Sequence, residues 1–300
     1  MQRMSQARSM MRLGLVLAYL LTAPATAHAA AGGTPVHGLW VWHGPTLLQT
    51  SEARERLRVF CSTADINEVY VSVLSQGGIG DAEALASLIG QLHRAQVRVE
   101  ALLSSTEADE PGTHREQFLA RVRLIVSFNQ QHPGSRFDGL HLDIEPQQRA
   151  ENKGSGNLRF LGPLTDTFRA VRALAEAAGL TVNADIQRKL LEATPAERRA
   201  LLQSLPRLTL MLYELSSPGD AGSADAKAQK LRTTSRALLD EAYADLEEHD
   251  LATLVIGLRT ADYGPLLPQM LATLDAANAS NPHYRGWARH SYNDTLREVP

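Results

Sequence analysis

Three ionisable residues alternate with apolar ones in the stretch FDGLHLDIEP, residues 137–146. His141, Asp143 and Glu145 stand at every second position, and in a β-strand such residues share one face. Burying ionised groups costs several kcal/mol each unless they are fully paired. The pattern therefore indicates a face used for chemistry, with a buried structural charge network as the alternative.

Two carboxylates on one strand face suit the hydrolysis of a glycosidic bond, which in most enzymes needs a pair of acids about 5 to 9 Å apart. The rise of a strand would separate the Cα atoms of Asp143 and Glu145 by roughly 6 to 7 Å. Glu145, at the strand end, is placed to reach a leaving group. The deeper Asp143 is better suited to stabilising a cation or an acetamido group.

The elements around this stretch follow a repeating order. Short apolar runs alternate with segments of helical periodicity, which predicts a parallel sheet with crossover helices. The runs span residues 36–43, 68–74, 97–103, 137–145, 180–186, 208–215, 252–258 and 284–292. Eight such units in about 260 residues predict an α/β fold, a (β/α)8 TIM barrel. The last run lies close to residue 300, so we expect the eighth helix to be short or missing.

A TIM barrel carries its active site at the carboxyl ends of the strands. The longest polar connections, residues 105–116, 147–157 and 216–229, all follow strands and are expected to build a substrate cleft there. In the strand at 137–145, Leu140, Leu142 and Ile144 would face the helices, and the ionisable residues would face the barrel axis.

Several stretches resemble one enzyme family. DGLHLDIE, residues 138–145, resembles the fourth-strand signature Asp-Gly-x-Asp-x-Asp-x-Glu of family 18 glycoside hydrolases, the chitinase and endo-N-acetylglucosaminidase family. LMLYEL (210–215) is similar to its Met-x-Tyr-Asp motif, and LVIGLRTADYG (254–264) is similar to its strand-seven pattern. Trp287 stands in the eighth strand, where the family keeps an aromatic floor.

The resemblance implies a set of roles. Glu145 would be the general acid that protonates the glycosidic oxygen, and Asp143 would hold the 2-acetamido group of the substrate. Tyr213 would hydrogen-bond that group while it attacks the anomeric carbon, so catalysis would be substrate-assisted. His141 departs from the pattern, since it replaces the family's middle acid. We hypothesise that neighbouring acids raise the pKa of His141 and that its charge holds Asp143 ionised.

Other residues are expected near the substrate. Trp40 and Trp42 share one strand face, and Trp42 lies nearer the barrel mouth. An aromatic content of 5% favours short or soluble glycans over crystalline polymer. The expected substrate-binding residues are Trp42, Trp287, Asp185 and Glu214.

Two other functions remain open. His141 motivates a catalytically weak glycan-binding barrel, and the His-x-Asp-x-Glu spacing motivates a metal-dependent phosphodiesterase. The histidines at 37, 43, 141 and 290 could gather inside the barrel, but they lack a fixed metal-ligand spacing. We therefore expect no cofactor and no resident metal.

The N-terminal segment, residues 1–29, predicts a signal peptide. Three arginines precede the apolar run LGLVLAYLL, and small residues follow at 27–29, as a signal peptidase requires. The run is roughly half of the ~20 residues that span a bilayer. We expect a secreted or periplasmic protein without stable membrane insertion, in which residues 30–300 form a single barrel domain.

The net charge limits which partners the protein can bind, and the cysteine content limits which disulfides it can form. Removing the three arginines of the signal segment changes the net charge from −3 to −6, which is not the footprint of a nucleic-acid-binding protein. Cys61 is the only cysteine, so no intramolecular disulfide forms. We expect a monomer that acts on a glycan.

Overall fold

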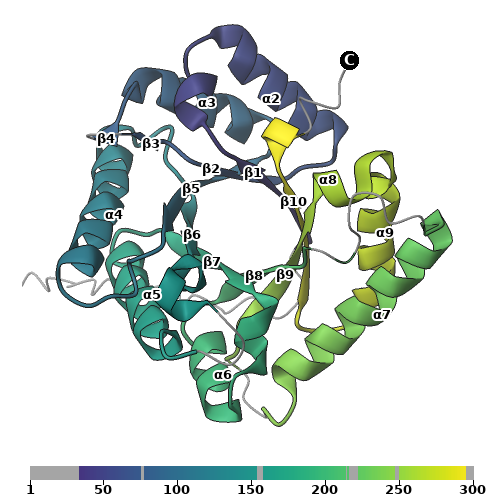
Figure 1. The fold of residues 1–300 in the computed structure, drawn as a ribbon. Coiled ribbons are helices and arrows are strands. Elements are labelled where there is room, and N and C mark those ends of the chain that lie inside the picture. The colour runs from purple at the N-terminus through teal and green to yellow at the C-terminus, as the bar shows by residue number, and fades with distance from the viewer. Residues whose placement is uncertain are drawn as a thin grey trace, which may run out of the picture. The chain divides into compact units, whose positions relative to one another are not determined.

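A closed barrel of eight parallel strands forms the centre of the protein. The computed structural model describes residues 34–75, 78–153, 158–213, 215, 222–246 and 250–294. The strand order around the barrel is β1-β10-β9-β8-β7-β6-β5-β2, and β1 pairs with both β10 and β2 to close it. The predicted TIM barrel is confirmed (Figure 1). Its strands are β1 (Val36–Val41), β2 (Glu68–Val71), β5 (Arg98–Ser105), β6 (Gly139–Ile144), β7 (Thr181–Gln187), β8 (Arg207–Met211), β9 (Thr253–Arg259) and β10 (Tyr284–His290).

Helices surround the barrel on its outside (Figure 1). They are α1 (Gly44–Leu47), α2 (Ser51–Thr63), α3 (Ala82–Arg94), α4 (Thr113–Gln131), α5 (Leu161–Glu176), α6 (Pro195–Leu202), α7 (Ala224–Tyr243), α8 (Thr260–Tyr263) and α9 (Leu267–Asn278). A small hairpin of β3 (Leu74–Ser75) and β4 (Gly78–Ile79) follows β2, and short 3-10 turns are η1 (Pro146–Gln148), η2 (Ala150–Asn152), η3 (Arg188–Glu192) and η4 (Gly264–Leu266). The predicted signal segment and the end of the expected eighth helix lie outside the described residues.

Side-chain caps fix where several helices begin. Thr50, Asp81 and Ser223 each accept a hydrogen bond from a backbone N–H in the first turn of α2, α3 and α7. Thr194 and Glu197 form a capping box at the start of α6. These caps satisfy N–H groups that a helix leaves unpaired, so the loops that precede these four helices each end at a defined residue.

The protein has two buried layers. The larger one lies between the strands and the helices and includes Leu140, Leu142 and Ile144 of β6, as alternation predicts. The smaller one fills the barrel itself with the inward residues Val36, Trp40, Tyr70, Leu102, Val255 and Ala288. The ionisable side chains of the barrel interior lie around this inner cluster.

Two glycines make room for the large rings of the inner cluster. A Cβ atom at Gly38 would overlap the hydroxyl of Tyr70, and one at Gly257 would lie 2.8 Å from the indole of Trp40. Without these glycines neither ring fits inside the barrel. The glycines therefore help to position the two aromatic residues that contact His141.

Candidate active site

The inward row of β6 lies where alternation predicts it. His141 and Asp143 are buried inside the barrel, and Glu145 follows the strand at its carboxyl end, partly exposed. Strand register places His141 beside Leu102 of β5 and Asn183 of β7. The three residues thus form a column from the middle of the barrel to its mouth.

Glu145 is held by amide side chains at the mouth. Gln147 and Gln187 each donate to its Oε1 at 3.1 Å, and Gln148 donates to Oε2. Partial burial is the main cause that raises the pKa of Glu145, and the charge of Asp185 adds to it, although these amides oppose the shift. A carboxyl group whose pKa is raised keeps its proton at a higher pH, so at the strand end it can serve as a general acid.

Asp143 lies one layer deeper and is more strongly affected. Burial raises its pKa well above the usual value, and the charges of Asp185 and Glu145 raise it further, while His141 opposes them. His141 acts on the pKa of Asp143 in the direction that the hypothesis of an ionised Asp143 expects, but burial and the two neighbouring acids outweigh it and favour the protonated carboxyl group.

His141 binds acids on the two neighbouring strands. Its Nδ1 lies 3.3 Å from Glu100 Oε2 on β5, and its Nε2 lies 2.8 Å from Asp185 Oδ1 on β7. Burial would lower the pKa of His141, but Asp185 and Glu100 outweigh it and raise the pKa to about 9. The expected direction is confirmed, but the acids responsible are Asp185 and Glu100.

Tyr213 joins this group from the end of β8. Its hydroxyl is buried and has no hydrogen-bond partner among the described residues. Burial and the charges of three acids, Asp185, Asp143 and Glu145, raise the pKa of Tyr213. The structure thus brings Tyr213 together with the column on β6, with a buried hydroxyl that none of the described residues hydrogen-bonds.

The four expected substrate-binding residues lie in different parts of the protein. Trp42 lies at the mouth and donates from Nε1 to Nε2 of His290 at 3.0 Å, beside the ring of Tyr213. Asp185 lies deeper, fully buried, where it binds His141 and Trp40. Glu214 falls outside the described residues.

Trp287 does not lie with these residues. Its indole packs in the outer layer, stacked on His37 at 4.2 Å, and donates to Asp275 at 3.0 Å. The expected position at the barrel mouth is therefore corrected. Alternation contained the signal, because Trp287 and His290 are three residues apart in one strand and must face opposite sides.

The histidines do not form one cluster. His37 points into the outer layer toward Asp65 and Asp275, His43 is exposed, and His141 and His290 lie at different depths. Within the described residues, no group of three or more histidines, cysteines or acids is arranged to hold a metal ion. None of the helices among those residues has the length and hydrophobicity of a membrane span.

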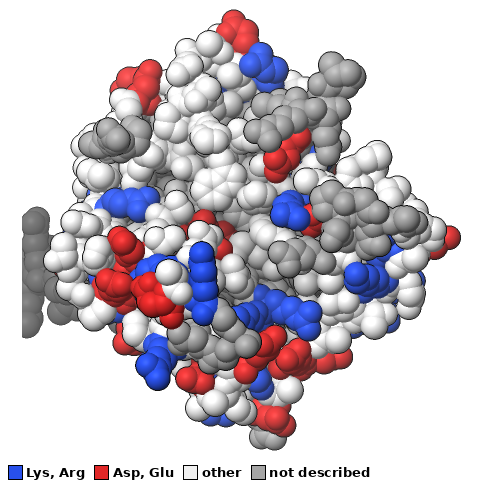
Figure 2. Space-filling view, in the orientation of Figure 1, with Lys and Arg blue, Asp and Glu red and all other residues white. Residues whose placement is uncertain are grey.

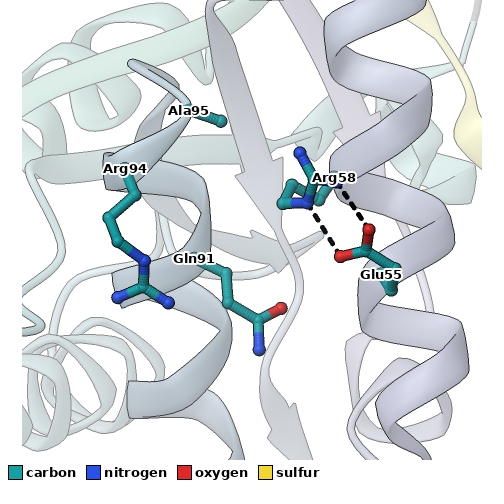
Figure 3. A pocket seen from close by; sticks show the side chains of 5 residues that line it. All are labelled: Glu55, Arg58, Gln91, Arg94 and Ala95. Carbon is teal, nitrogen blue, oxygen red and sulfur yellow. Dashed lines mark hydrogen bonds and ion pairs between the residues drawn. The ribbon is translucent and has the colours of Figure 1, made fainter.

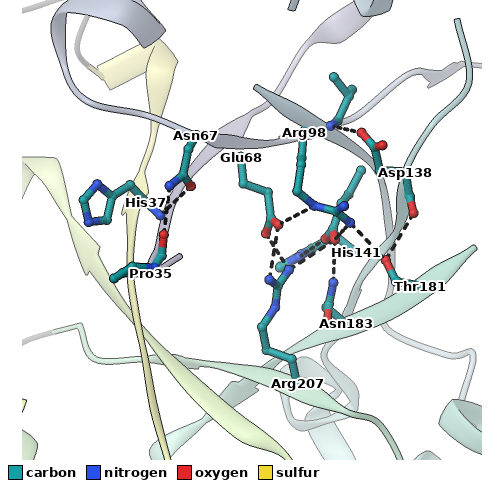
Figure 4. Close-up of polar contacts among 12 residues, drawn as sticks. Pro35, His37, Asn67, Glu68, Arg98, Asp138, His141, Thr181, Asn183 and Arg207 are labelled. Carbon is teal, nitrogen blue, oxygen red and sulfur yellow. Dashed lines mark hydrogen bonds and ion pairs between the residues drawn. The ribbon is translucent and has the colours of Figure 1, made fainter. Parts of the chain in front are cut away.

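A second ionic network lies at the opposite, amino-terminal end of the barrel (Figure 4). Arg207 of β8 contacts Glu68 and Glu100, and Asn183 donates to Glu100 at 2.6 Å. A cavity of about 750 Å³ opens beside these residues. Sequence reasoning missed this network, although alternation along the strand at 97–103 would have placed Glu100 inside the barrel.

A groove of about 440 Å³ between α2 and α3 is lined by Glu55, Arg58, Gln91, Arg94 and Ala95 (Figure 3). Arg58 and Glu55 pair within one helix there and are partly exposed. On the face around the barrel axis, basic and acidic side chains are interspersed over the described surface (Figure 2).

The fold can now be compared with known proteins. The spore cortex-lytic enzyme SleL of Bacillus cereus superposes with a TM-score of 0.54 over 86% of this chain and 71% of its own, at 9% identity. The PgaB (BpsB) glycoside hydrolase domain of Bordetella bronchiseptica superposes with a TM-score of 0.52 over 89% and 96%, at 11% identity. This chain shares the TIM-barrel fold with both proteins. No protein-family model and no curated protein matches its sequence. At such low identity the likeness establishes the fold.

Proposed function

We propose that the protein is a secreted glycoside hydrolase that cleaves a glycan containing N-acetylhexosamine. The observation that carries the proposal is the meeting of Glu145, Asp143 and the unpartnered hydroxyl of Tyr213 at the carboxyl end of the barrel. The two superposed structures support it, because one is named as a cortex-lytic enzyme and the other as a glycoside hydrolase domain. The signal-like segment at 1–29 supports secretion.

Glu145 is the general acid of the proposed reaction. It lies nearest the mouth, and burial raises its pKa, so it carries a proton closer to neutral pH than a free glutamate does. In the reaction it gives that proton to the glycosidic oxygen as the bond to the anomeric carbon breaks. The amides of Gln147, Gln148 and Gln187 hold the carboxyl group in place and remain as donors to the carboxylate that forms.

The acetamido group of the substrate supplies the nucleophile in this proposal. Its carbonyl oxygen attacks the anomeric carbon and forms a cyclic intermediate, which water then opens. Asp143 accepts a hydrogen bond from the acetamido N–H, and the Tyr213 hydroxyl donates to the acetamido oxygen. Both groups are buried, so a ligand that satisfies them gains more than it would from exposed groups. Trp42 is the proposed wall for the sugar ring.

The test compares one oligosaccharide in acetylated and de-acetylated form, each assayed with and without a chelator. We expect cleavage of the acetylated form alone, with no effect of the chelator. Comparable cleavage of both forms would refute substrate assistance. Loss of cleavage with chelator would indicate the metal-dependent phosphodiesterase, and binding without any cleavage would indicate the glycan-binding barrel.

A further inference from the structure

The contacts of His141 determine its protonation state. Its two ring nitrogens each lie within hydrogen-bond distance of a carboxylate oxygen, at 3.3 Å from Glu100 and 2.8 Å from Asp185. A neutral imidazole carries one N–H and can donate to only one of them. The side chain has no exposed surface, so water does not replace either partner. Both contacts are satisfied only when His141 is an imidazolium.

The contacts of Asp185 determine its state as well. One carboxylate oxygen accepts from His141, and the other accepts from the indole N–H of Trp40 at 3.0 Å. The indole N–H and the imidazolium can only donate hydrogen bonds, so neither can accept one from a protonated carboxyl group. Both oxygens of Asp185 therefore act as hydrogen-bond acceptors inside the barrel. Tyr70 stacks on the His141 ring at 3.6 Å and holds it in this geometry.

Asp143 and Asp185 directly follow the paired residues Leu142 and Ala184, so they are neighbours on the adjacent strands β6 and β7. The ionisable groups that act on Asp143 come from three directions: His141 and Glu145 along β6, Asp185 on β7, and Tyr213 after β8. Around His141, Glu100 lies on β5, Asp185 on β7, Tyr70 on β2, and His290 beyond Trp40 on β10. Arg207 of β8 contacts Glu100, which in turn contacts His141. Arg259 of β9 lies over the Tyr213 ring.

We propose that Glu100, His141 and Asp185 form a fixed ion triad in which Asp185 is a positioning residue that makes Asp143 retain its proton. The inference deepens the proposed function, because Asp143 is the residue proposed to hold the acetamido group. On β6, His141 stands where the family motif has an acid. In the triad, Asp185 of β7 supplies a charged acid instead. Asp185 acts through Asp143 and has no free oxygen for the substrate.

The triad also sets which substrates the site accepts. A neutral Asp143 and a buried tyrosine hydroxyl match an uncharged amide, which offers one donor and one acceptor. A de-acetylated sugar carries an ammonium group instead, and burying that cation requires an ionised partner. The triad therefore selects acetylated over de-acetylated glycans by keeping charge away from Asp143.

The first test measures protonation by NMR and needs no turnover. In wild-type protein with ¹⁵N-labelled histidine and ¹³C-labelled aspartate, we expect His141 to be doubly protonated and Asp143 to be neutral at pH 7. A neutral His141 or an ionised Asp143 at that pH would overturn the proposal. Glu100→Gln removes one negative charge beside His141, so the deprotonation midpoint of His141 should fall.

The second test removes the charge of Asp185. In Asp185→Asn we expect the ionisation midpoint of Asp143 to fall by about one pH unit or more, the size of a close like-charge effect. Asp275→Asn is the matched control, since it removes an aspartate that pairs with a histidine in the outer layer. An unchanged midpoint for Asp143 in folded Asp185→Asn, or an equal fall in Asp275→Asn, would overturn the proposal.

The third test measures specificity by binding. We compare the Kd values of an acetylated and a de-acetylated tetrasaccharide at pH 6, where the amine is a cation. Asp185→Asn should shift the ratio toward the de-acetylated form by about tenfold, which corresponds to one pKa unit. An unchanged ratio contradicts the selection role. If no glycan is cleaved in any assay while the NMR results hold, the proposed hydrolase function fails and the triad stands.

Discussion

At the residue scale, environment separates two acids that stand two positions apart. Glu145 is partly exposed and held by amides, whereas Asp143 is enclosed and lies near the charge of Asp185. Pairs of acids whose surroundings differ in this way commonly take different roles in one reaction. The difference assigns proton transfer to Glu145 and contact with the substrate amide to Asp143 in the proposed mechanism.

Glu145→Gln keeps the shape of the side chain and removes its proton. We expect a loss of about 10²-fold or more in kcat on unactivated glycans, the size of lost general acid catalysis. The melting temperature should stay close to that of the wild type. Glu176→Gln, at the exposed end of α5, is the control and should retain full activity. Wild-type rates in Glu145→Gln would exclude Glu145 as the acid.

Tyr213→Phe removes a buried hydroxyl that has no partner among the described residues. An unsatisfied buried polar group costs about 1 to 3 kcal/mol, so the variant should unfold at a higher urea concentration. Its kcat/KM for the acetylated glycan should nevertheless fall, by about tenfold or more for one lost hydrogen bond to a developing charge. A variant that is both less stable and fully active would contradict the proposed role.

The sequence predicted these residues better than their partners. Alternation alone placed positions 141, 143 and 145 on one inward face, because the period of a strand is two. The acids that bind His141 come from β5 and β7, and their register depends on packing between strands that are distant in sequence. For that reason the sequence pointed to Asp143 and Glu145 as the partners of His141, whereas the structure shows Glu100 and Asp185.

At the element scale, two loops at the carboxyl end of the barrel are tied together. Arg149, beside η1 and η2, makes two hydrogen bonds of 2.8 and 2.9 Å to the buried carboxylate of Asp109, in the loop after β5. The same turn region carries Gln147 and Gln148, which bind Glu145. The ion pair therefore supports the position of the proposed acid from outside the barrel.

Arg149→Met leaves the carboxylate of Asp109 buried without its cation. We expect a loss of about 3 kcal/mol in the free energy of unfolding, as for other broken buried pairs. Activity should fall as well, because the turn that holds Glu145 loses its anchor. Arg169→Met breaks an exposed pair with Asp166 and should cost less than about 1 kcal/mol. Urea unfolding of both variants checks the prediction, which fails if the two losses are equal.

The elements themselves were largely predictable. Each apolar run expected as a strand overlaps a strand of the barrel, because apolar β-forming runs separated by amphipathic segments leave few other folds. The side of each strand was harder to assign where both sides are buried. In β10, Trp287 and His290 both carry large rings, so residue type does not show which of them faces inward. The two are distinguished only by counting positions from a residue that is known to face inward.

At the scale of the whole molecule, the buried imidazolium makes stability depend on pH. Asp185 and Glu100, working against burial, raise the pKa of His141 from 6.5 to about 9 in the folded protein. A raised pKa stabilises the fold fully below the unfolded value and loses that contribution as pH rises through the folded value. The free energy of unfolding should therefore fall by on the order of 3 kcal/mol between pH 6.5 and 9.

Urea unfolding at several pH values measures this slope. His141→Gln should remove most of the decline, whereas the exposed His43→Gln should leave it intact. An equal slope in the wild type and His141→Gln would show that His141 is neutral in the folded protein. The comparison uses differences between variants, so other titrating groups cancel.

The network at the amino-terminal end of the barrel constrains how the chain folds. Glu68 of β2 and Arg207 of β8 are 139 residues apart in sequence, and their strands lie four positions apart around the barrel in either direction. During synthesis, β2 and β5 emerge with both acids and with Arg98, a half-exposed cation that lies 3.3 Å from Glu68. Closing so long a loop costs chain entropy before the contacts that stabilise it can form. The buried cation of this network, Arg207, arrives only with β8, so its pairing with Glu68 and Glu100 belongs to the same late stage of folding as closure of the barrel.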